Sequence, residues 1–229
     1  MSALLDSFLS PAAPSLKICG VTQASEAAQL ADLEVHALGV NFWEQSKRYC
    51  PVESARDFLP ALKGRMLRVG VFVNADPSLP QELLESDLLD LVQFHGDENA
   101  AYCHQFSSRG LPFAKAISIP PRTDSVLDLP APGDFETNAI LIDAHAPGVY
   151  GGTGQTTDWA LCGMYISAFG GVSVILAGGI TPENAAEALT VVHPAALDVA
   201  SGAESTPGRK DFEKVAALLA AVRAAENAN

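Results

Sequence analysis

The sequence has little positive charge. Its 229 residues include 14 Lys and Arg against 27 Asp and Glu, which gives a net charge of −13. The basic residues never form a run longer than a pair such as Lys47-Arg48. Proteins that bind nucleic acid or an anionic membrane surface present a basic face. Neither kind of partner is therefore expected.

Long hydrophobic runs and cysteine motifs are also missing. The apolar stretches end well short of the roughly 20 residues that span a bilayer. Residues 1–15 lack the basic and apolar segments of a secretory signal. The four cysteines form neither a C-x-x-C pair nor a zinc pattern: Cys19, Cys50, Cys103 and Cys162. We therefore expect no metal site, reduced thiols and a cytoplasmic location.

What the sequence does contain is enough apolar material for a core. Hydrophobic residues make up 48% and charged residues 18%, which excludes a wholly disordered chain. From residue 16 onward, short β-branched runs alternate with Ala/Leu/Glu stretches at helical spacing. Near-continuous hydrophobic runs are typical of strands covered on both faces. We expect strands over 16–21, 35–42, 66–73, 88–95, 113–119, 139–143, 173–177 and 196–200.

Helical spacing follows most of these strands. It predicts helices over 23–32, 51–62, 77–85, 98–107, 159–168, 182–191 and 211–225. The connection 120–137 is rich in Pro and Asp, so its helix should be short or irregular. Eight strands alternating with helices predict an α/β fold, a single (β/α)₈ TIM barrel over residues 16–229. An open doubly wound sheet is the alternative.

Residues 1–15 precede this pattern and contain Pro11 and Pro14. We expect an N-terminal extension outside the barrel, either a loose, dispensable tail or a short amphipathic turn around Leu4, Leu5 and Phe8.

Polar residues interrupt the predicted strands near their C-terminal ends, where barrel active sites lie. Strand alternation turns Lys17 and Cys19 inward if Ile18 packs outward, and it places Gln93 and His95 on one shared face. A buried polar side chain costs several kcal/mol unless it is partnered, so each needs a reason.

Two carboxylates occupy similar places. Asp143 ends the sixth predicted strand and Asp198 lies in the eighth. Each of these residues taken singly is more often structural than functional. Their convergence on one rim favours a catalytic or substrate-binding site.

Glycine-rich loops follow the seventh and eighth strands, at Gly178-Gly179 and Ser201-Gly202. Small residues there let backbone N–H groups approach an anion, and this is the common phosphate site of phosphate-binding barrels. Lys17 and Arg48 are the cations placed to assist, and the planar guanidinium of Arg48 suits a carboxylate or a phosphate. The loop 150–156, Tyr-Gly-Gly-Thr-Gly-Gln-Thr, resembles neither a Walker loop nor a dinucleotide fingerprint. It is either a surface loop or a lid.

Eight segments, taken in order, resemble the phosphoribosylanthranilate isomerase family of tryptophan biosynthesis. They are Lys-Ile-Cys-Gly-Val-Thr (17–22), Ser-Lys-Arg-Tyr (46–49), Arg-Val-Gly-Val-Phe-Val-Asn (68–74), Val-Gln-Phe-His-Gly-Asp-Glu (92–98), Leu-Ile-Asp (141–143), Tyr-Gly-Gly-Thr-Gly-Gln-Thr-Thr-Asp-Trp (150–159), Leu-Ala-Gly-Gly-Ile-Thr-Pro-Glu-Asn (176–184) and Asp-Val-Ala-Ser-Gly-Ala-Glu (198–204).

The resemblance implies an Amadori rearrangement of N-(5-phosphoribosyl)anthranilate by a (β/α)₈ barrel without a cofactor. By similarity, Cys19 matches the general base, Asp143 the general acid and Arg48 a substrate-binding arginine near the anthranilate end. The loops after strands seven and eight match the phosphate cradle. We expect Lys17 to lower the pKa of the Cys19 thiol.

We assign the remaining rim residues to substrate binding: Lys17, Gln93, His95 and Asp198. The expected partner is a phosphosugar, with the chain a monomer or a homodimer. Two alternatives stay open at this point. One is another phosphate-binding barrel enzyme, of the indole-glycerol-phosphate, tryptophan-synthase-α or metal-dependent pentose-phosphate-epimerase type. The other is a non-enzymatic binder that kept the phosphate cradle.

Overall fold

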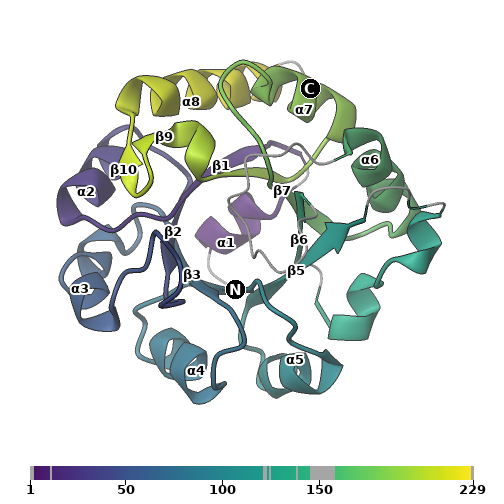
Figure 1. Cartoon of the computed structure of the whole chain (residues 1–229), viewed down its shortest axis with the longest axis horizontal. Helices are drawn as coiled ribbons and strands as arrows, with labels where there is room; N and C mark the ends of the chain where they lie inside the picture. The colour runs from purple at the N-terminus through teal and green to yellow at the C-terminus, as the bar shows by residue number, and fades with distance from the viewer. Residues whose placement is uncertain are drawn as a thin grey trace.

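Eight parallel strands close into a barrel (Figure 1). The structure is a computed structural model, and it describes residues 3–10, 12–120, 123, 125–137, 139–144 and 158–227. The strands follow chain order around the barrel, and β8 closes on β1 through the pair Lys17 and Asp198. They are β1 (Ser15–Cys19), β2 (Ala37–Asn41), β3 (Leu67–Phe72), β4 (Leu91–Phe94), β5 (Phe113–Ile119), β6 (Ala139–Ala144), β7 (Ser173–Leu176) and β8 (Ala196–Val199). The predicted TIM barrel is confirmed, and the open sheet is excluded.

Helices surround the barrel. They are α2 (Ala24–Asp32), α3 (Val52–Arg56), α4 (Ser78–Glu85), α5 (Ala100–Ser107), α6 (Trp159–Ala168), α7 (Ala185–Val192) and α8 (Phe212–Glu226). Every described helix is too short or too polar to span a lipid bilayer.

Two connections show how proline shapes this outer ring. The helix predicted over 51–62 is in fact split into α3 and a 3₁₀ helix, η1 (Leu59–Leu62). Pro60 has no N–H to donate within the helix, so an α-helix does not continue through it. The connection between β5 and β6 is irregular, as predicted, with the 3₁₀ turns η2 (Val126–Asp128) and η3 (Pro132–Phe135).

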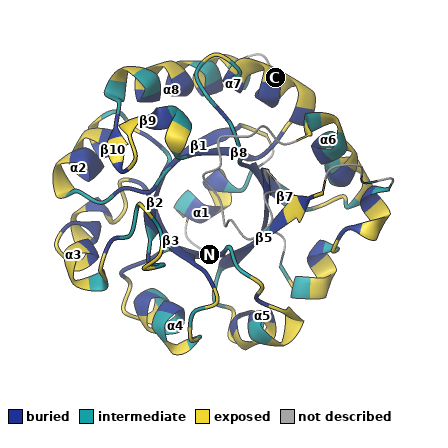
Figure 2. Ribbon diagram, in the orientation of Figure 1, coloured by how far each residue is buried: buried dark blue, intermediate teal, exposed yellow. Residues whose placement is uncertain are grey.

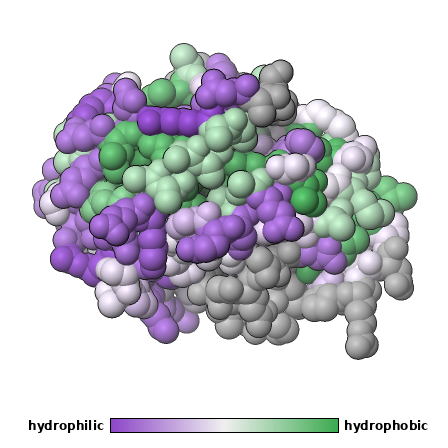
Figure 3. All heavy atoms as spheres, turned by 90° about the horizontal axis from the view of Figure 1, so that it is seen from above, coloured by the Kyte–Doolittle hydropathy of each residue, from purple (hydrophilic) through white to green (hydrophobic). Residues whose placement is uncertain are grey.

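Most strand residues are buried, as the burial colours show (Figure 2), and Ser118 near the end of β5 is an exposed exception. Ile18 packs outward into the core between strands and helices, which supports the predicted inward direction of Lys17 and Cys19. The outer surface of the helices carries a mixture of polar and apolar side chains (Figure 3).

The N-terminal end of the barrel is closed by α1 (Ala3–Phe8), which lies inside the ring of strands in Figure 1. Leu5 and Phe8 are 2% and 1% exposed and pack against barrel residues such as Leu67. Ser173 Oγ also donates a 2.6 Å hydrogen bond to the Leu9 carbonyl. The expectation of a loose tail is therefore wrong for this segment, and the amphipathic alternative is the one observed.

A small element after β8 was not predicted. The 3₁₀ turn η4 (Ser201–Ala203) leads into an antiparallel pair, β9 (Glu204–Thr206) and β10 (Arg209–Lys210). This hairpin lies beside β1 and α2, inside the ring of helices (Figure 1).

Candidate active site

A buried ion pair stands at the centre of the predicted site. Lys17 of β1 donates from Nζ to Asp198 Oδ2 of β8 at 2.8 Å and to Gln93 Oε1 of β4 at 3.0 Å. Lys17 and Gln93 are each 1% exposed. Lys17 and its two partners lie on three different strands, so the ammonium group cross-links the inside of the barrel. An ammonium ion so deeply buried is tolerated because it is fully paired.

The same hydrogen-bonded chain continues to Asp143. Gln93 Nε2 lies 2.9 Å from His95 Nδ1, and His95 Nε2 lies 3.2 Å from Asp143 Oδ2. Lys17 can only donate, which fixes Gln93 Oε1 as the acceptor and turns Nε2, a donor, toward His95. In the neutral ring, Nδ1 then accepts and Nε2–H donates to Asp143. The histidine tautomer therefore follows from the lysine.

Cys19 lies beside Lys17. A Cβ atom added to Gly39 of β2 would come within 2.8 Å of Cys19 Sγ and 3.1 Å of Lys17 Nζ, so both side chains cross this glycine. The thiol is half-buried, whereas the other three cysteines are buried.

The expected effect of Lys17 on this thiol is outweighed. Burial raises the pKa of Cys19 above its ordinary value, and the Asp198 carboxylate raises it further. Lys17 and Lys210 lower the pKa but do not cancel these two effects. Lys17 thus lowers the pKa of Cys19, as expected, but burial of the thiol and the Asp198 carboxylate leave the net shift upward.

Arg48 extends toward Cys19 from the loop after β2. Its Nε and Nη2 donate to the two oxygens of Glu204 at 2.8 and 2.7 Å. Its side chain lies against Gly20, where an added Cβ would come within 2.3 Å of Arg48 Cδ and the φ angle is +77°. Glycine is required at residue 20 on both counts. The bidentate pair uses two of the five guanidinium N–H groups.

Glu204 and Lys210 were missed as site residues. Lys210 Nζ donates to the Cys19 carbonyl at 2.5 Å and to Glu204 Oε1 at 2.9 Å, and both residues are buried. Glu204 ends the last of the eight recognised segments. A carboxylate next to small, loop-forming residues was therefore a usable signal.

The two glycine-rich loops are in direct contact. Gly178 and Gly179 have φ angles of +87° and +64°, which favour glycine. A Cβ at Gly202 would come within 1.8 Å of the Ile180 carbonyl oxygen, so only glycine fits there. The predicted phosphate residues Gly178, Gly179, Ser201 and Gly202 thus come together after β7 and β8.

Two further expectations concern the loop 150–156 and a metal site. The glycine-rich loop 150–156 and its closure lie outside the described residues. Among the residues that are described, no cluster of three or more His, Cys, Asp or Glu could hold a metal ion.

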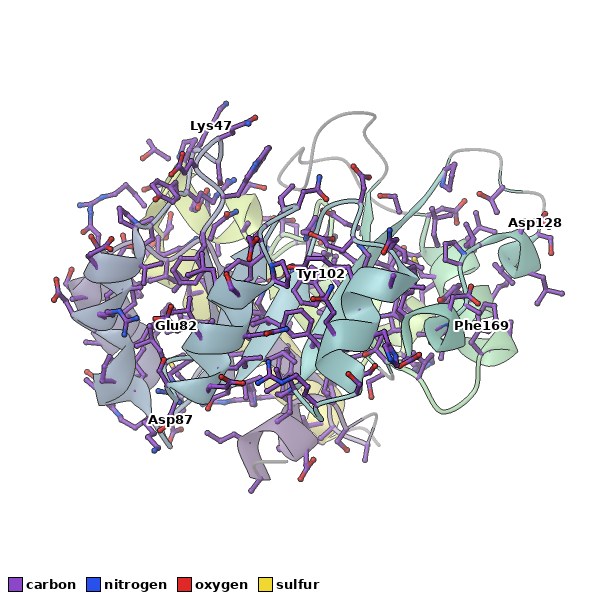
Figure 4. All side chains as sticks on the ribbon, turned by 90° about the horizontal axis from the view of Figure 1, so that it is seen from below. Lys47, Glu82, Asp87, Tyr102, Asp128 and Phe169 are labelled. Atoms are coloured by element: carbon purple, nitrogen blue, oxygen red, sulfur yellow. The ribbon has the colours of Figure 1, made fainter. Side chains whose placement is uncertain are left out.

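The candidate site lies at the opposite end of the barrel from α1. Lys47, next to Arg48, lies at the upper end in Figure 4, and α1 lies at the lower end. The fold and the site define a class of protein: a (β/α)₈ barrel with titratable side chains and glycine-rich loops at the C-terminal ends of its strands, as in phosphate-binding barrel enzymes.

The chain belongs to the N-(5'-phosphoribosyl)anthranilate isomerase family, whose model, described as N-(5'phosphoribosyl)anthranilate (PRA) isomerase, matches residues 16–221. An N-(5'-phosphoribosyl)anthranilate isomerase from Syntrophus aciditrophicus is 42% identical over 208 residues, covering 91% of this chain and 86% of the relative. One from Thiobacillus denitrificans is 39% identical, covering 91% and 98%.

Solved structures agree. The phosphoribosyl anthranilate isomerase of Thermotoga maritima superposes with a TM-score of 0.78 at 31% identity, covering 92% of this chain and 99% of that one. The Thermus thermophilus enzyme gives 0.77 at 34% identity, covering 92% and 98%. The recognised family is confirmed, and the other barrel enzymes left open by the sequence are set aside.

Proposed function

We propose that this chain converts N-(5-phosphoribosyl)anthranilate into 1-(o-carboxyphenylamino)-1-deoxyribulose 5-phosphate in tryptophan biosynthesis, with Cys19 as base and Asp143 as acid. A related structure at 30% identity is described as a complex with the reduced form of this product. The observation that carries the assignment is the continuous contact chain from the Cys19–Lys17 pair through Gln93 and His95 to Asp143.

The proton transfers follow from these positions. Asp143 protonates the furanose ring oxygen, the ring opens, and the anilino nitrogen becomes an iminium. The iminium acidifies the neighbouring C–H, and the Cys19 thiolate removes that proton. The resulting enamine tautomerises to the ketone. General acid and base groups of this kind each contribute about 10²–10⁴-fold to a rate.

The remaining residues divide between support and binding. Lys17 and Gln93 are too deeply buried to offer much surface to a ligand, so we assign them to holding Cys19 and His95. His95 and Asp198 remain substrate-binding candidates. Arg48 receives the anthranilate carboxylate, and the backbone at Gly178, Gly179, Ser201 and Gly202 receives the phosphate.

Purified protein should consume phosphoribosylanthranilate, as monitored by its fluorescence. Cys19→Ala and Asp143→Asn should each lose at least about 100-fold in kcat while still binding the reduced product analogue. Cys50→Ala is the matched control, since Cys50 is a buried thiol of the hydrophobic core whose Sγ donates to the neighbouring Pro51 carbonyl. Full activity in Cys19→Ala would end the assignment of the base.

We also propose a cytoplasmic location and a monomeric or homodimeric state. All four cysteines are free thiols, as a reducing compartment requires. The Thermotoga maritima enzyme is described as dimeric, with monomers generated from it. Sedimentation of the purified chain across a range of concentrations distinguishes the two states.

A further inference from the structure

The β9–β10 hairpin places a buried lysine against the proposed base, in a contact that the proton transfers above do not use. The side chain of Lys210 is fully buried, with 0% exposed. Its Nζ donates to the carbonyl oxygen of Cys19 itself at 2.5 Å. Burying an ammonium ion costs several kcal/mol, so the contacts that Lys210 makes here must offset that cost.

The charged side chains around the Cys19 thiol form two groups that differ in net charge. Lys17 and Asp198 are a one-to-one pair at 2.8 Å, so their charges cancel at a distance. Glu204, in contrast, serves two cations: it accepts from Lys210 at 2.9 Å and from Arg48 at 2.8 and 2.7 Å. That second group carries one positive charge in excess.

The neighbouring carboxylate of α2 does not change this pairing. Glu26 Oε1 accepts a 3.0 Å hydrogen bond from the backbone N–H of Lys210, not from its ammonium group. The charged groups that face Cys19 are thus Lys17 and Asp198 from β1 and β8, Arg48 from the loop after β2, and Glu204 with Lys210 from the hairpin.

We propose that Lys210 is a positioning residue for Cys19: its ammonium group holds the Cys19 backbone in place, and its charge, left in excess by the shared Glu204, stabilises the thiolate. The sequence pointed to Lys17 for this task, because it lies two residues before Cys19 on the same face of the strand. Lys17 also acts on the thiol, but its charge is offset by Asp198. Lys210 adds to that effect, because its carboxylate, Glu204, is shared with Arg48. This inference rests on the proposed role of Cys19.

The direction of the effect follows from the charges. Burial and Asp198 raise the pKa of Cys19, and Lys210 opposes them. Removing the charge of Lys210 must therefore raise the pKa further and reduce the thiolate fraction at neutral pH. Removing the charge of Glu204 must act in the opposite sense.

The test measures the rate of Cys19 alkylation by iodoacetamide against pH in the full chain. Cys19→Ala gives the background from the three buried thiols. Lys210→Gln keeps a donor for the Cys19 carbonyl but loses the charge. We expect its alkylation midpoint to rise by about one pH unit, which means about tenfold slower alkylation at neutral pH. Lys210→Arg keeps the charge, so its alkylation midpoint should stay at the wild-type value.

Two further variants keep the result interpretable. Glu204→Gln should shift the midpoint downward, and it stands as the independent test if Lys210→Gln does not fold. Lys115→Gln is the matched control, because Lys115 is also a buried lysine that holds a carbonyl, at 2.7 Å from Gly96 O, and a carboxylate, at 3.1 Å from Glu98, on β5. It should leave the midpoint unchanged.

An unchanged midpoint in Lys210→Gln, or an upward shift in Glu204→Gln, would overturn the proposal. Alkylation needs no turnover, so its outcome is separate from that of the proposed function. If the midpoint shifts as expected while Cys19→Ala remains active, the charge effect stands and the role of Cys19 as base falls. The pH profile of kcat should move with the alkylation midpoint when both hold.

Discussion

The two ends of the barrel are closed by opposite kinds of chemistry. At the N-terminal end, Leu5 and Phe8 of α1 pack onto apolar strand residues such as Leu67 and Leu91. At the C-terminal end, Lys17 and Asp198 meet inside the barrel as a buried ion pair. Apolar burial stabilises the fold directly, whereas a buried ion pair is weak evidence for stability. The difference indicates that the N-terminal, lower end of the barrel contributes stability, whereas the C-terminal, upper end is organised for chemistry.

The largest effect should come from breaking the ion pair at the upper end. Asp198→Asn keeps the shape of the side chain but leaves the Lys17 ammonium buried without a counter-charge. We expect a loss of about 3–5 kcal/mol in unfolding free energy. We also expect at least a 100-fold loss of kcat/KM, because general acid–base effects are of that order and the Lys17–Gln93–His95 chain begins at this pair.

Urea unfolding and steady-state kinetics on the same preparation measure both effects. A loss of stability below about 1 kcal/mol would mean that water or another group compensates Lys17. Because Asp198→Asn should lower both stability and activity, it does not by itself separate the contributions of the two ends.

The second effect should be confined to stability. Leu5→Ala removes a side chain that is 2% exposed from the apolar closure, and buried Leu→Ala changes cost about 2–5 kcal/mol. The kcat should stay at the wild-type value. Leu127→Ala is the matched control, since Leu127 is 70% exposed on η2 and its loss should change stability by less than about 0.5 kcal/mol.

If Leu5→Ala and Leu127→Ala unfold at the same urea concentration, α1 does not close the barrel in solution. If Leu5→Ala lowers kcat at an unchanged fraction of folded protein, the two ends are coupled through the interior of the barrel.

A smaller effect should appear at the upper end alone. His95→Phe fills the same space but cannot hold Asp143 Oδ2, which His95 Nε2 approaches at 3.2 Å. A hydrogen bond to a charged group contributes about 1.5–3 kcal/mol, so kcat should fall by about 10- to 100-fold. The unfolding free energy should fall by less than in Leu5→Ala, because the phenyl ring keeps the packing of the imidazole and only its hydrogen bonds to Gln93 and Asp143 are lost. A stability loss as large as that of Leu5→Ala would instead make His95 a structural residue.

The sequence predicted the barrel well because its signals are local. Each of the eight strands is a short, mainly apolar run whose residues are mostly buried, and each predicted strand overlaps an observed one. The boundaries differ where the local signal is weak. For example, β4 begins at Leu91, not at residue 88, because Leu88 and Leu89 are buried in the turn before the strand.

What escaped prediction depends on contacts between distant residues. Leu5 and Phe8 read as a loose segment until the open end of the barrel supplies the surface they cover. The pairing of Lys17 with Asp198 joins residues 181 positions apart, and that of Arg48 with Glu204 joins residues 156 apart. No periodicity records such pairings, so the charge balance at Cys19 could not be derived from its neighbours in sequence.

The last comparison distinguishes the two ends of the barrel by how the stability of their variants depends on pH. Burial alone would raise the pKa of Glu204, but its bonds to Arg48 and Lys210 bring the pKa below its ordinary value. A carboxylate with a lowered folded-state pKa stabilises the protein above its unfolded pKa of about 4.3, and that contribution is lost as the pH falls through the folded value. The unfolding free energies of wild type and Glu204→Gln should therefore differ by a constant amount above about pH 5 and converge below about pH 4. Wild type and Leu5→Ala should keep the same difference throughout, because no charge changes at the lower end. A gap between wild type and Glu204→Gln that does not narrow in acid would mean that Glu204 is not held as an anion by its two cations.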